Sequence, residues 1–150
     1  MIDRKWIGKD WGESVLHVER DRLRAFAHAI GETDPVYLDP LAARRAGYTD
    51  MLAPPTFVFA AEMDSGVLDR LLADLDMPPE RLLHGEQSFR FHQPVCAGDT
   101  VTVRSTITDI FDKKAGALSF VVRESKATNQ HGAVVCELKM VLVRLNGGRA

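Results

Sequence analysis

The stretch that decides the fold covers residues 51–75 and reads MLAPPTFVFAAEMDSGVLDRLLADL. Residues 56–61 have no polar face for more than one helical turn, and a helix that is apolar all round has to be buried all round. The later part is amphipathic through its aliphatic residues, which are Val67, Leu68, Leu71, Leu72 and Leu75. The sequence therefore predicts one long central helix, buried along its first half and emerging towards solvent before Met77–Pro79.

The remainder of the chain alternates apolar and polar residues with the period of a β-strand. Four such runs predict four long strands, each of which turns its apolar face to the core. The predicted core faces are Phe89 and Phe91; Val101, Val103 and Ile107; Leu118, Phe120 and Val122; and Val134, Cys136, Leu138, Met140 and Leu142. The turns at 97–99, 114–116 and 129–132 are short enough for antiparallel neighbours, and we expect a fifth strand around 14–18.

These elements predict a single α+β domain. A long buried helix and a run of antiparallel strands pack well when the sheet curls around the helix and buries its apolar face there. With 150 residues, of which 45% are hydrophobic, the chain is long enough for one such core. A curled sheet keeps two bare edges, which a second subunit can cover by strand pairing. We therefore expect one domain over residues 1–150 that dimerises through its sheet edges.

Composition and charge exclude several classes of function. The formal net charge is -2 and the isoelectric point is about 6.2, so nothing indicates a nucleic-acid or membrane partner. The longest mostly apolar run, residues 51–61, contains two prolines and is far shorter than the roughly 20 residues of a membrane span. The N-terminus has no apolar stretch of the signal-peptide type, so we expect a cytoplasmic protein. Cys96 and Cys136 fall in strand-like segments and are expected to be buried, reduced thiols.

A polar loop precedes the central helix. Residues 18–30 predict an amphipathic helix, and Gly31 after it is the residue type that most easily adopts a left-handed helix cap. The loop continues as GETDPVY over residues 31–37, with carboxylates at Glu32 and Asp34 and a phenol at Tyr37. On its own, this pattern is also what an ordinary helix-to-turn junction uses. A second short helix is expected to start after Asp39 and to end before Gly47.

Several motifs, taken in order, give the chain a resemblance to a known family. The stretch GETDPVYLD at 31–39 is followed by LAPPTF at 52–57, by LHGEQSF at 83–89, and by the short motifs at 93–94 and 97–99. This chain resembles the MaoC-like hot-dog dehydratases and R-specific enoyl-thioester hydratases, in their divergent N-terminal-type branch. The family loop runs Gly-Asp-x-Asn-Pro-aliphatic-His. The resemblance implies a hot-dog fold, in which an antiparallel sheet wraps around a long central helix.

The resemblance also implies a substrate and a set of site residues. The substrate would be an acyl thioester of coenzyme A or of acyl carrier protein, with water added to or removed from a double bond. The thiol carrier is part of the substrate, so no separate cofactor and no metal are expected. Glu32 stands at the position of the family's Asp, Asp34 at that of its Asn and Tyr37 at that of its His. A phenol has a reference pKa near 10, against roughly 6.5 for imidazole, so Tyr37 is a hydrogen-bond donor and a poor base.

Further candidates lie at the helix start and in the first long strand. The family uses a backbone N–H at the start of the central helix to polarise the thioester carbonyl, and proline cannot donate, which leaves Thr56 or Phe57. His84 and His92 are eight residues apart in the sequence, so a regular strand turns both to the polar face, opposite Phe89. His84, beside Gly85, is a candidate catalytic or ligand-binding residue, with structural hydrogen bonding as the alternative.

Three functions remain open from the sequence. The first is a hydratase or dehydratase that uses Glu32, Asp34, Tyr37 and His84 for catalysis and Thr56, Phe57 and Gly85 for substrate binding. The second is a non-catalytic substrate-binding subunit, paired with a hot-dog partner that has an intact Asp and His. The third is a hot-dog thioesterase. The chain would accordingly form a homodimer or a heterodimer with another hot-dog subunit.

Overall fold

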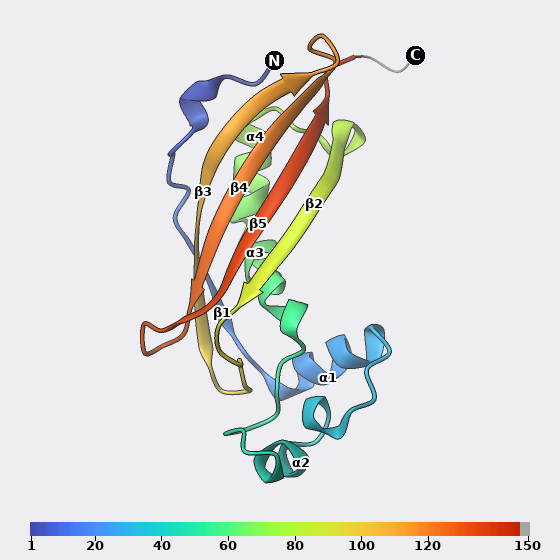
Figure 1. Cartoon of the computed structure of the whole chain (residues 1–150), viewed down its shortest axis with the longest axis vertical. Coiled ribbons are helices and arrows are strands. Elements are labelled where there is room, and N and C mark those ends of the chain that lie inside the picture. Colours follow the sequence, from blue (N-terminus) through green and yellow to red (C-terminus); the bar gives the residue numbers. More distant parts are fainter. Residues whose placement is uncertain (148–150) are drawn as a thin grey trace.

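The computed structural model describes residues 1–147, which form a curved five-stranded antiparallel sheet with helices on its inner face (Figure 1). The strand order across the sheet is β1-β3-β4-β5-β2, and every neighbouring pair is antiparallel. The strands are β1 (Glu13–His17), β2 (Leu82–Phe91), β3 (Thr100–Lys113), β4 (Leu118–Thr128) and β5 (Val134–Leu145). The predicted α+β sheet wrapped around a helical segment is confirmed.

The central helical segment lies along the inner face of the sheet and is divided into pieces. A 3-10 turn, η3 (Pro55–Phe59), leads into α3 (Ala60–Asp64), and α4 (Val67–Asp74) follows. Gly66 separates α3 from α4 with a φ of 68°, a left-handed conformation that glycine adopts without steric cost. The Ser65 hydroxyl accepts a hydrogen bond from Val67 N at 3.1 Å and so starts the second helix. The segment was expected to be one continuous helix, and the Ser-Gly pair is the reason that it is not.

The remaining helices gather at one end of the sheet (Figure 1). They are α1 (Arg20–Ala29), the 3-10 turn η2 (Pro35–Tyr37) and α2 (Pro40–Arg45), while η1 (Arg4–Trp6) and η4 (Pro79–Arg81) lie elsewhere. Gly31 has a φ of 74°, and Glu32 N donates to Ala27 O at 2.9 Å, as in a Schellman cap. The predicted glycine cap is therefore confirmed, as is the Asp39 cap of α2, whose Oδ1 accepts from Leu41 N at 2.9 Å. Within residues 1–147, no helix combines the length and the apolar character that a membrane crossing requires.

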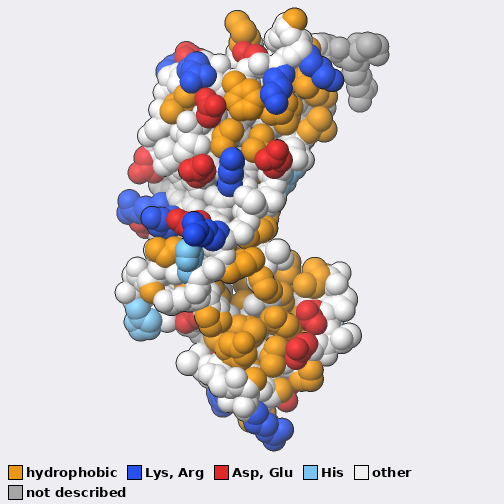
Figure 2. Space-filling model, in the orientation of Figure 1, with side chains coloured by type: hydrophobic (Ala, Val, Ile, Leu, Met, Phe, Trp, Pro, Cys, Tyr) orange, Lys and Arg blue, Asp and Glu red, His pale blue; other side chains and the backbone are white. Residues whose placement is uncertain are grey.

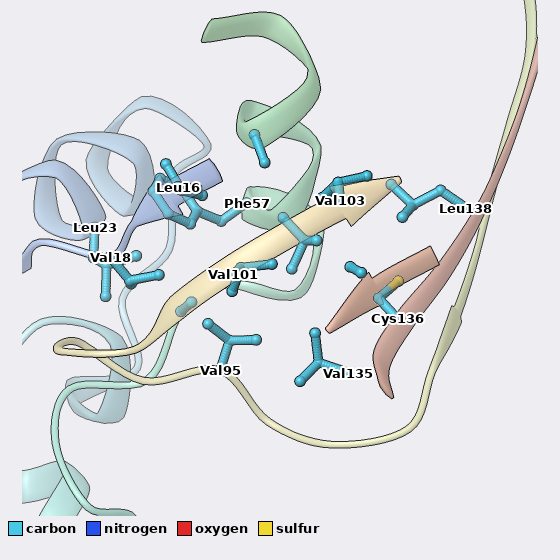
Figure 3. Packing of buried hydrophobic residues seen from close by; sticks show 14 of the residues in the cluster. Leu16, Val18, Leu23, Phe57, Val95, Val101, Val103, Val135, Cys136 and Leu138 are labelled. Carbon is cyan, nitrogen blue, oxygen red and sulfur yellow. The ribbon is translucent and has the colours of Figure 1, made fainter. Parts of the chain in front are cut away.

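The hydrophobic core consists of two clusters along the central segment. The first surrounds η3 and α3 and is shown in Figure 3; it includes Leu16, Val18, Leu23, Phe57, Val58, Ala61, Val101, Val103, Cys136 and Leu138. The second surrounds α4 and includes Trp11, Val67, Leu71, Leu75, Ile107, Ile110, Val121, Met140 and Leu142. Cys96 and Cys136 are buried and unpaired, as expected.

Between the two clusters lies a layer of buried polar side chains, which we call the polar belt. It consists of the buried side chains of Ser14 of β1, Glu62 of α3, Ser105 of β3, and Arg123 and Ser125 of β4, together with the half-buried Ser65. Glu62 is 0% exposed and Arg123 is 1% exposed, and Arg123 Nη1 lies 3.2 Å from Glu62 Oε2. Burial lowers the pKa of the Arg123 guanidinium, and the Glu62 carboxylate opposes that shift.

The belt corrects the expected core face of β4. Leu118, Phe120 and Val122 were predicted to face the core, but the fully buried positions are Ser119, Val121, Arg123 and Ala127. Phe120 instead stacks on Phe111, with ring centroids 5.0 Å apart. Alternation fixes the period of a strand but not which face is inside, and on β4 the more apolar face is the outer one.

Candidate functional site

An apolar pocket opens where the central segment begins. It has a volume of about 240 Å³. Residues 52–58 form one side of it, and the end of β2 and the segment that follows β2 form the other. Its lining consists of Leu52, Ala53, Pro54, Pro55, Val58, Phe91, His92, Gln93, Pro94, Val95 and Val135. Figure 2 shows hydrophobic side chains gathered over the lower half of the molecule, at the end where the short helices lie. The pocket can hold an apolar group of modest size.

One backbone donor is free beside this pocket. Phe57 N donates to Pro54 O at 2.8 Å, which closes the first turn of η3 and occupies the Phe57 amide. The Thr56 N–H has no hydrogen-bond partner within residues 1–147, as expected for the first turn of a helix. Thr56 is also exposed. Of the two amides that the sequence offered, the geometry leaves Thr56 as the available donor, and the Phe57 ring belongs to the core.

The polar loop lies at the same end of the molecule. Leu52 N donates to Val36 O at 3.0 Å, and the rings of Phe26 and Phe57 meet edge to face with centroids 5.4 Å apart. The first contact ties the loop to the residues that lead into η3, and the second ties α1 to η3 itself. The fold therefore brings together the motifs at 31–39 and 52–57, which are separated by twelve residues of chain.

Both loop carboxylates cap the loop itself. Glu32 Oε1 accepts from Thr33 N at 2.8 Å and from Asp34 N at 2.9 Å. Asp34 Oδ1 accepts from Val36 N at 3.0 Å and so starts the η2 turn. Asp34 is exposed and Glu32 is half-buried, so the loop does not enclose the pair. The second oxygen of each carboxylate has no hydrogen-bond partner among residues 1–147.

Tyr37 lies half-buried next to these carboxylates. Its pKa is raised above the ordinary value of a phenol, first by burial and then by the charges of Glu32 and Asp34, with a smaller contribution from Tyr48. The phenol therefore stays protonated at neutral pH and can donate a hydrogen bond. Tyr48, which follows the end of α2, joins the site without having been singled out, because nothing in its local sequence distinguishes it from a core tyrosine.

His84 lies away from the loop. The register between β2 and β5 shifts between His84 and Glu86, so Gly85 forms a bulge and the side-chain alternation changes phase. The His84 ring consequently meets Phe59 of the central segment, with centroids 6.0 Å apart, and its Nε2 lies 3.2 Å from Gln87 Oε1. The structure does not bring His84 together with the loop residues or into the lining of the pocket.

The two histidines of this region do not share a face, contrary to the expectation for a regular strand. His92 Nε2 lies 2.9 Å from Glu137 Oε2, and Glu137 is on the outer face of the sheet, between the core residues Cys136 and Leu138. The bulge is the physical reason for the difference. Gly85 itself has a packing role, since a Cβ added there would lie 3.0 Å from Val143 Cγ2. Among residues 1–147, no group of three or more His, Cys, Asp or Glu residues is arranged to hold a metal.

Comparison with known proteins agrees with this architecture. A family model described as FAS1-like, dehydratase domain region matches residues 5–138. A UPF0336 protein of Thermobifida fusca is 38% identical over 144 residues, which cover 95% of this chain and 94% of the relative.

Two solved structures have the same fold. A chain of the C-terminally truncated HadBC (3R-hydroxyacyl-ACP dehydratase) complex from Mycobacterium tuberculosis has a TM-score of 0.80 at 28% identity, covering 92% of this chain and 96% of that chain. A MaoC-like dehydratase from Rhodospirillum rubrum has a TM-score of 0.69 at 24% identity, covering 99% of each chain. The hot-dog fold and the resemblance to MaoC-like dehydratases are thereby confirmed.

Proposed function

This chain belongs to the family of FAS1-like dehydratase domain regions, and on that premise we propose that it is the substrate-binding subunit of a hot-dog hydratase or dehydratase. Its substrates are enoyl or 3-hydroxyacyl thioesters of coenzyme A or acyl carrier protein. The chain holds the acyl group, and a second hot-dog subunit with an intact Asp and His supplies the acid-base chemistry. The observation that carries this proposal is a pocket with a free amide donor beside a loop that has a phenol, Tyr37, at the position of the family's His.

The pocket and the Thr56 amide suit a thioester. The lining is apolar, which fits an acyl group, and Thr56 lies next to Pro55 at the pocket's edge. Removal of a proton next to a thioester carbonyl places negative charge on the carbonyl oxygen in the transition state. An unpaired helix N–H aimed at that oxygen stabilises this charge. We assign this task to the Thr56 amide.

The loop supports binding better than catalysis. A general base needs a pKa near the working pH, and the pKa of Tyr37 is shifted further away from it by burial and by the two carboxylates. Glu32 and Asp34 each use one oxygen to hold the backbone of the loop in place. We infer that Tyr37 orients the substrate or water by donating a hydrogen bond, and that the proton is moved by a partner residue.

The free edge of β2 supports a partner subunit. β2 is a ten-residue edge strand, whereas the opposite edge, β1, has five residues. Leu83 and Phe91 of β2 are 51% and 49% exposed. A long edge with exposed apolar side chains favours pairing with another strand. The relative from Mycobacterium tuberculosis, at 28% identity, is part of a two-component complex by its name. We propose that β2 pairs with a second hot-dog subunit.

Hydration of crotonyl-coenzyme A, followed by the loss of enoyl absorbance, tests the proposal. The chain purified alone is expected to bind the thioester without hydrating it, and co-expression with a hot-dog subunit that carries the Asp and His should give an active complex. Hydration by the chain alone would overturn the binding-only role. Release of free thiol would identify a thioesterase, and absence of both binding and activity with every partner would overturn the proposal altogether.

A variant of the amide donor makes the test more specific. In the active complex, Thr56→Pro removes the N–H and is expected to lower kcat by roughly a hundred- to a thousandfold, the usual loss for one oxyanion donor. Thr56→Ala keeps the N–H and is the matched control, expected to retain activity close to that of the unmodified complex. Equal losses in the two variants would show that the Thr56 side chain, rather than its amide, matters.

A second candidate is a homodimeric hydratase that uses Glu32 as its acid-base group. The observation in its favour is that Glu32 Oε2 has no hydrogen-bond partner within residues 1–147 and is therefore available to contact a substrate or a water molecule. This candidate requires the chain alone to hydrate crotonyl-coenzyme A and Glu32→Gln to abolish that activity. Activity of the chain alone that survives in Glu32→Gln would exclude Glu32 from the reaction.

A further inference from the structure

The apolar pocket ends one helical turn before the polar belt. Val58 is the residue furthest along the central segment among those that line the pocket. Glu62 follows four residues later, about one turn further along the central segment, in α3. Both side chains are buried. Glu62 is therefore the first charged side chain of the central segment beyond the pocket.

The belt connects the central segment to three neighbouring strands, β1, β3 and β4. Glu62 comes from α3 and accepts a hydrogen bond from the Ser125 hydroxyl of β4. Arg123 Nη2 donates to Ser105 Oγ of β3 at 2.7 Å, and Ser105 pairs with Ser125 across the two strands. At the β1 side, Ser14 Oγ and Ser65 Oγ are 2.7 Å apart. On the side of β1, β3 and β4, the belt thus lies between the cluster around η3 and the cluster around α4, while Phe59 packs against both clusters.

The central ion pair of the belt is incompletely bonded. Arg123 Nη1 and Glu62 Oε2 lie 3.2 Å apart, but their orientation does not suit a hydrogen bond. Within residues 1–147, these two atoms and Arg123 Nε have no hydrogen-bond partner. Buried polar atoms without partners are costly, and replacing a buried ion pair by apolar residues is often neutral or stabilising. A role in stability is therefore a poor explanation for this pair, and its position suggests a role in specificity.

We propose that the Glu62–Arg123 pair closes the inner end of the acyl pocket and restricts this subunit to short acyl chains. This inference rests on the proposed acyl-binding function. A longer chain would have to separate the two charges and place alkyl carbons against them, which gives up the ion pair without replacing it. The pocket in front of Val58 remains available, so the thioesters that bind are those whose acyl group fits there.

Binding of a series of saturated thioesters tests the limit. Butyryl-, octanoyl-, dodecanoyl- and hexadecanoyl-coenzyme A are titrated against the purified chain by calorimetry. While the acyl group still fits the pocket, each added methylene is expected to tighten binding by up to about fourfold, the value of one buried CH₂. Beyond that length the affinity should stop rising. Affinity that rises steadily to hexadecanoyl-coenzyme A would overturn the inference without any variant.

The double variant Glu62→Ala with Arg123→Ala opens the belt and is expected to move the limit to longer chains. If it does not fold, Glu62→Ala with Arg123→Met removes both charges while keeping more of the side-chain volume. Leu71→Ala is the matched control, because it loosens the second cluster beyond the belt and leaves the pair intact. An unchanged limit in the folded belt variant, or an equal shift in the control, would overturn the inference. A chain that binds none of these thioesters would overturn the proposed function, and the inference with it.

Discussion

Two buried carboxylates, Asp50 at the helical end of the molecule and Glu62 in the polar belt, are bonded very differently. Asp50 accepts from Arg20 Nε at 2.8 Å, from Arg44 Nη2 at 2.9 Å and from Met51 N at 2.8 Å. Together, the hydrogen bond from Arg20 and that from the Met51 amide hold the pKa of Asp50 well below its usual range. Glu62 has one serine and one arginine that lies close without a hydrogen bond.

The difference in hydrogen bonding distinguishes the ion pairs of Asp50, which stabilise the fold, from the Glu62–Arg123 pair, whose presence stability does not explain. Asp50 links α1, α2 and the strand-like segment before η3, so its bonds hold the loop and the pocket entrance together. Every bond that it makes stabilises the charged form. The Glu62–Arg123 pair is more deeply buried, yet it leaves polar atoms unbonded. Saturated bonding indicates a scaffold, and incomplete bonding in the core indicates that a function has been favoured over stability.

The largest expected effect is the loss of stability on substitution of Glu62 in the polar belt. Glu62→Gln leaves the Arg123 guanidinium buried without a counter-charge, so we expect a loss of roughly 3–5 kcal/mol in the free energy of unfolding. The double variant Glu62→Leu with Arg123→Met removes both charges and should unfold at close to the free energy of the unmodified chain. Urea denaturation measures both. A double variant as unstable as Glu62→Gln would mean that the pair is a structural element like Asp50.

A smaller effect, with a distinct pH dependence, is expected for Asp50. Asp50→Asn loses the charge-assisted bonds and should cost about 2 kcal/mol at neutral pH. Because the folded-state pKa of Asp50 is depressed, its contribution is fully present above the unfolded pKa of about 3.9 and is lost as the pH falls towards the folded value. The difference in unfolding free energy between the unmodified chain and Asp50→Asn should therefore be constant near neutrality and shrink below about pH 4. A difference that does not shrink would argue against the charge as its source.

Most of the fold could be predicted from the sequence, because the periodicity of hydrophobic residues is a local property of each segment. Alternation over each strand, the apolar stretch at 56–61 and the glycine after α1 each fixed an element without reference to the others. Two interruptions were missed. The bulge at Gly85 could not be predicted, because it exists only in relation to the register of β5. The break at Gly66 did have a local signal, the Ser65-Gly66 pair, but the helical pattern on both sides of it was given more weight.

The candidate site could be predicted only in part, because only its residues within short motifs leave a local signal in the sequence. The loop, Tyr37 and Thr56 were found because they fall within short motifs, and the structure brings them to one end of the molecule. The belt was not found, because Glu62 and Arg123 are far apart in sequence and each occupies a position where a charged residue is normally solvated. Arg123 was assigned to an outer face, since the more apolar residues of β4 lie on the other side.

The smallest expected loss of stability is for substitution of Asp34 in the loop. Variants of this residue distinguish a structural role as a cap from a role in the reaction. Asp34→Ala removes the acceptor that starts η2 and should cost about 1 kcal/mol in unfolding free energy, as for other helix caps. Asp34→Asn keeps an oxygen that can accept from Val36 N, so stability should return to that of the unmodified chain. If the carboxylate acts only as a cap, Asp34→Asn also retains full activity in the complex with a catalytic partner. Loss of activity in a stable Asp34→Asn variant would instead show that the Asp34 carboxylate takes part in the reaction, in addition to accepting the hydrogen bond from Val36 N.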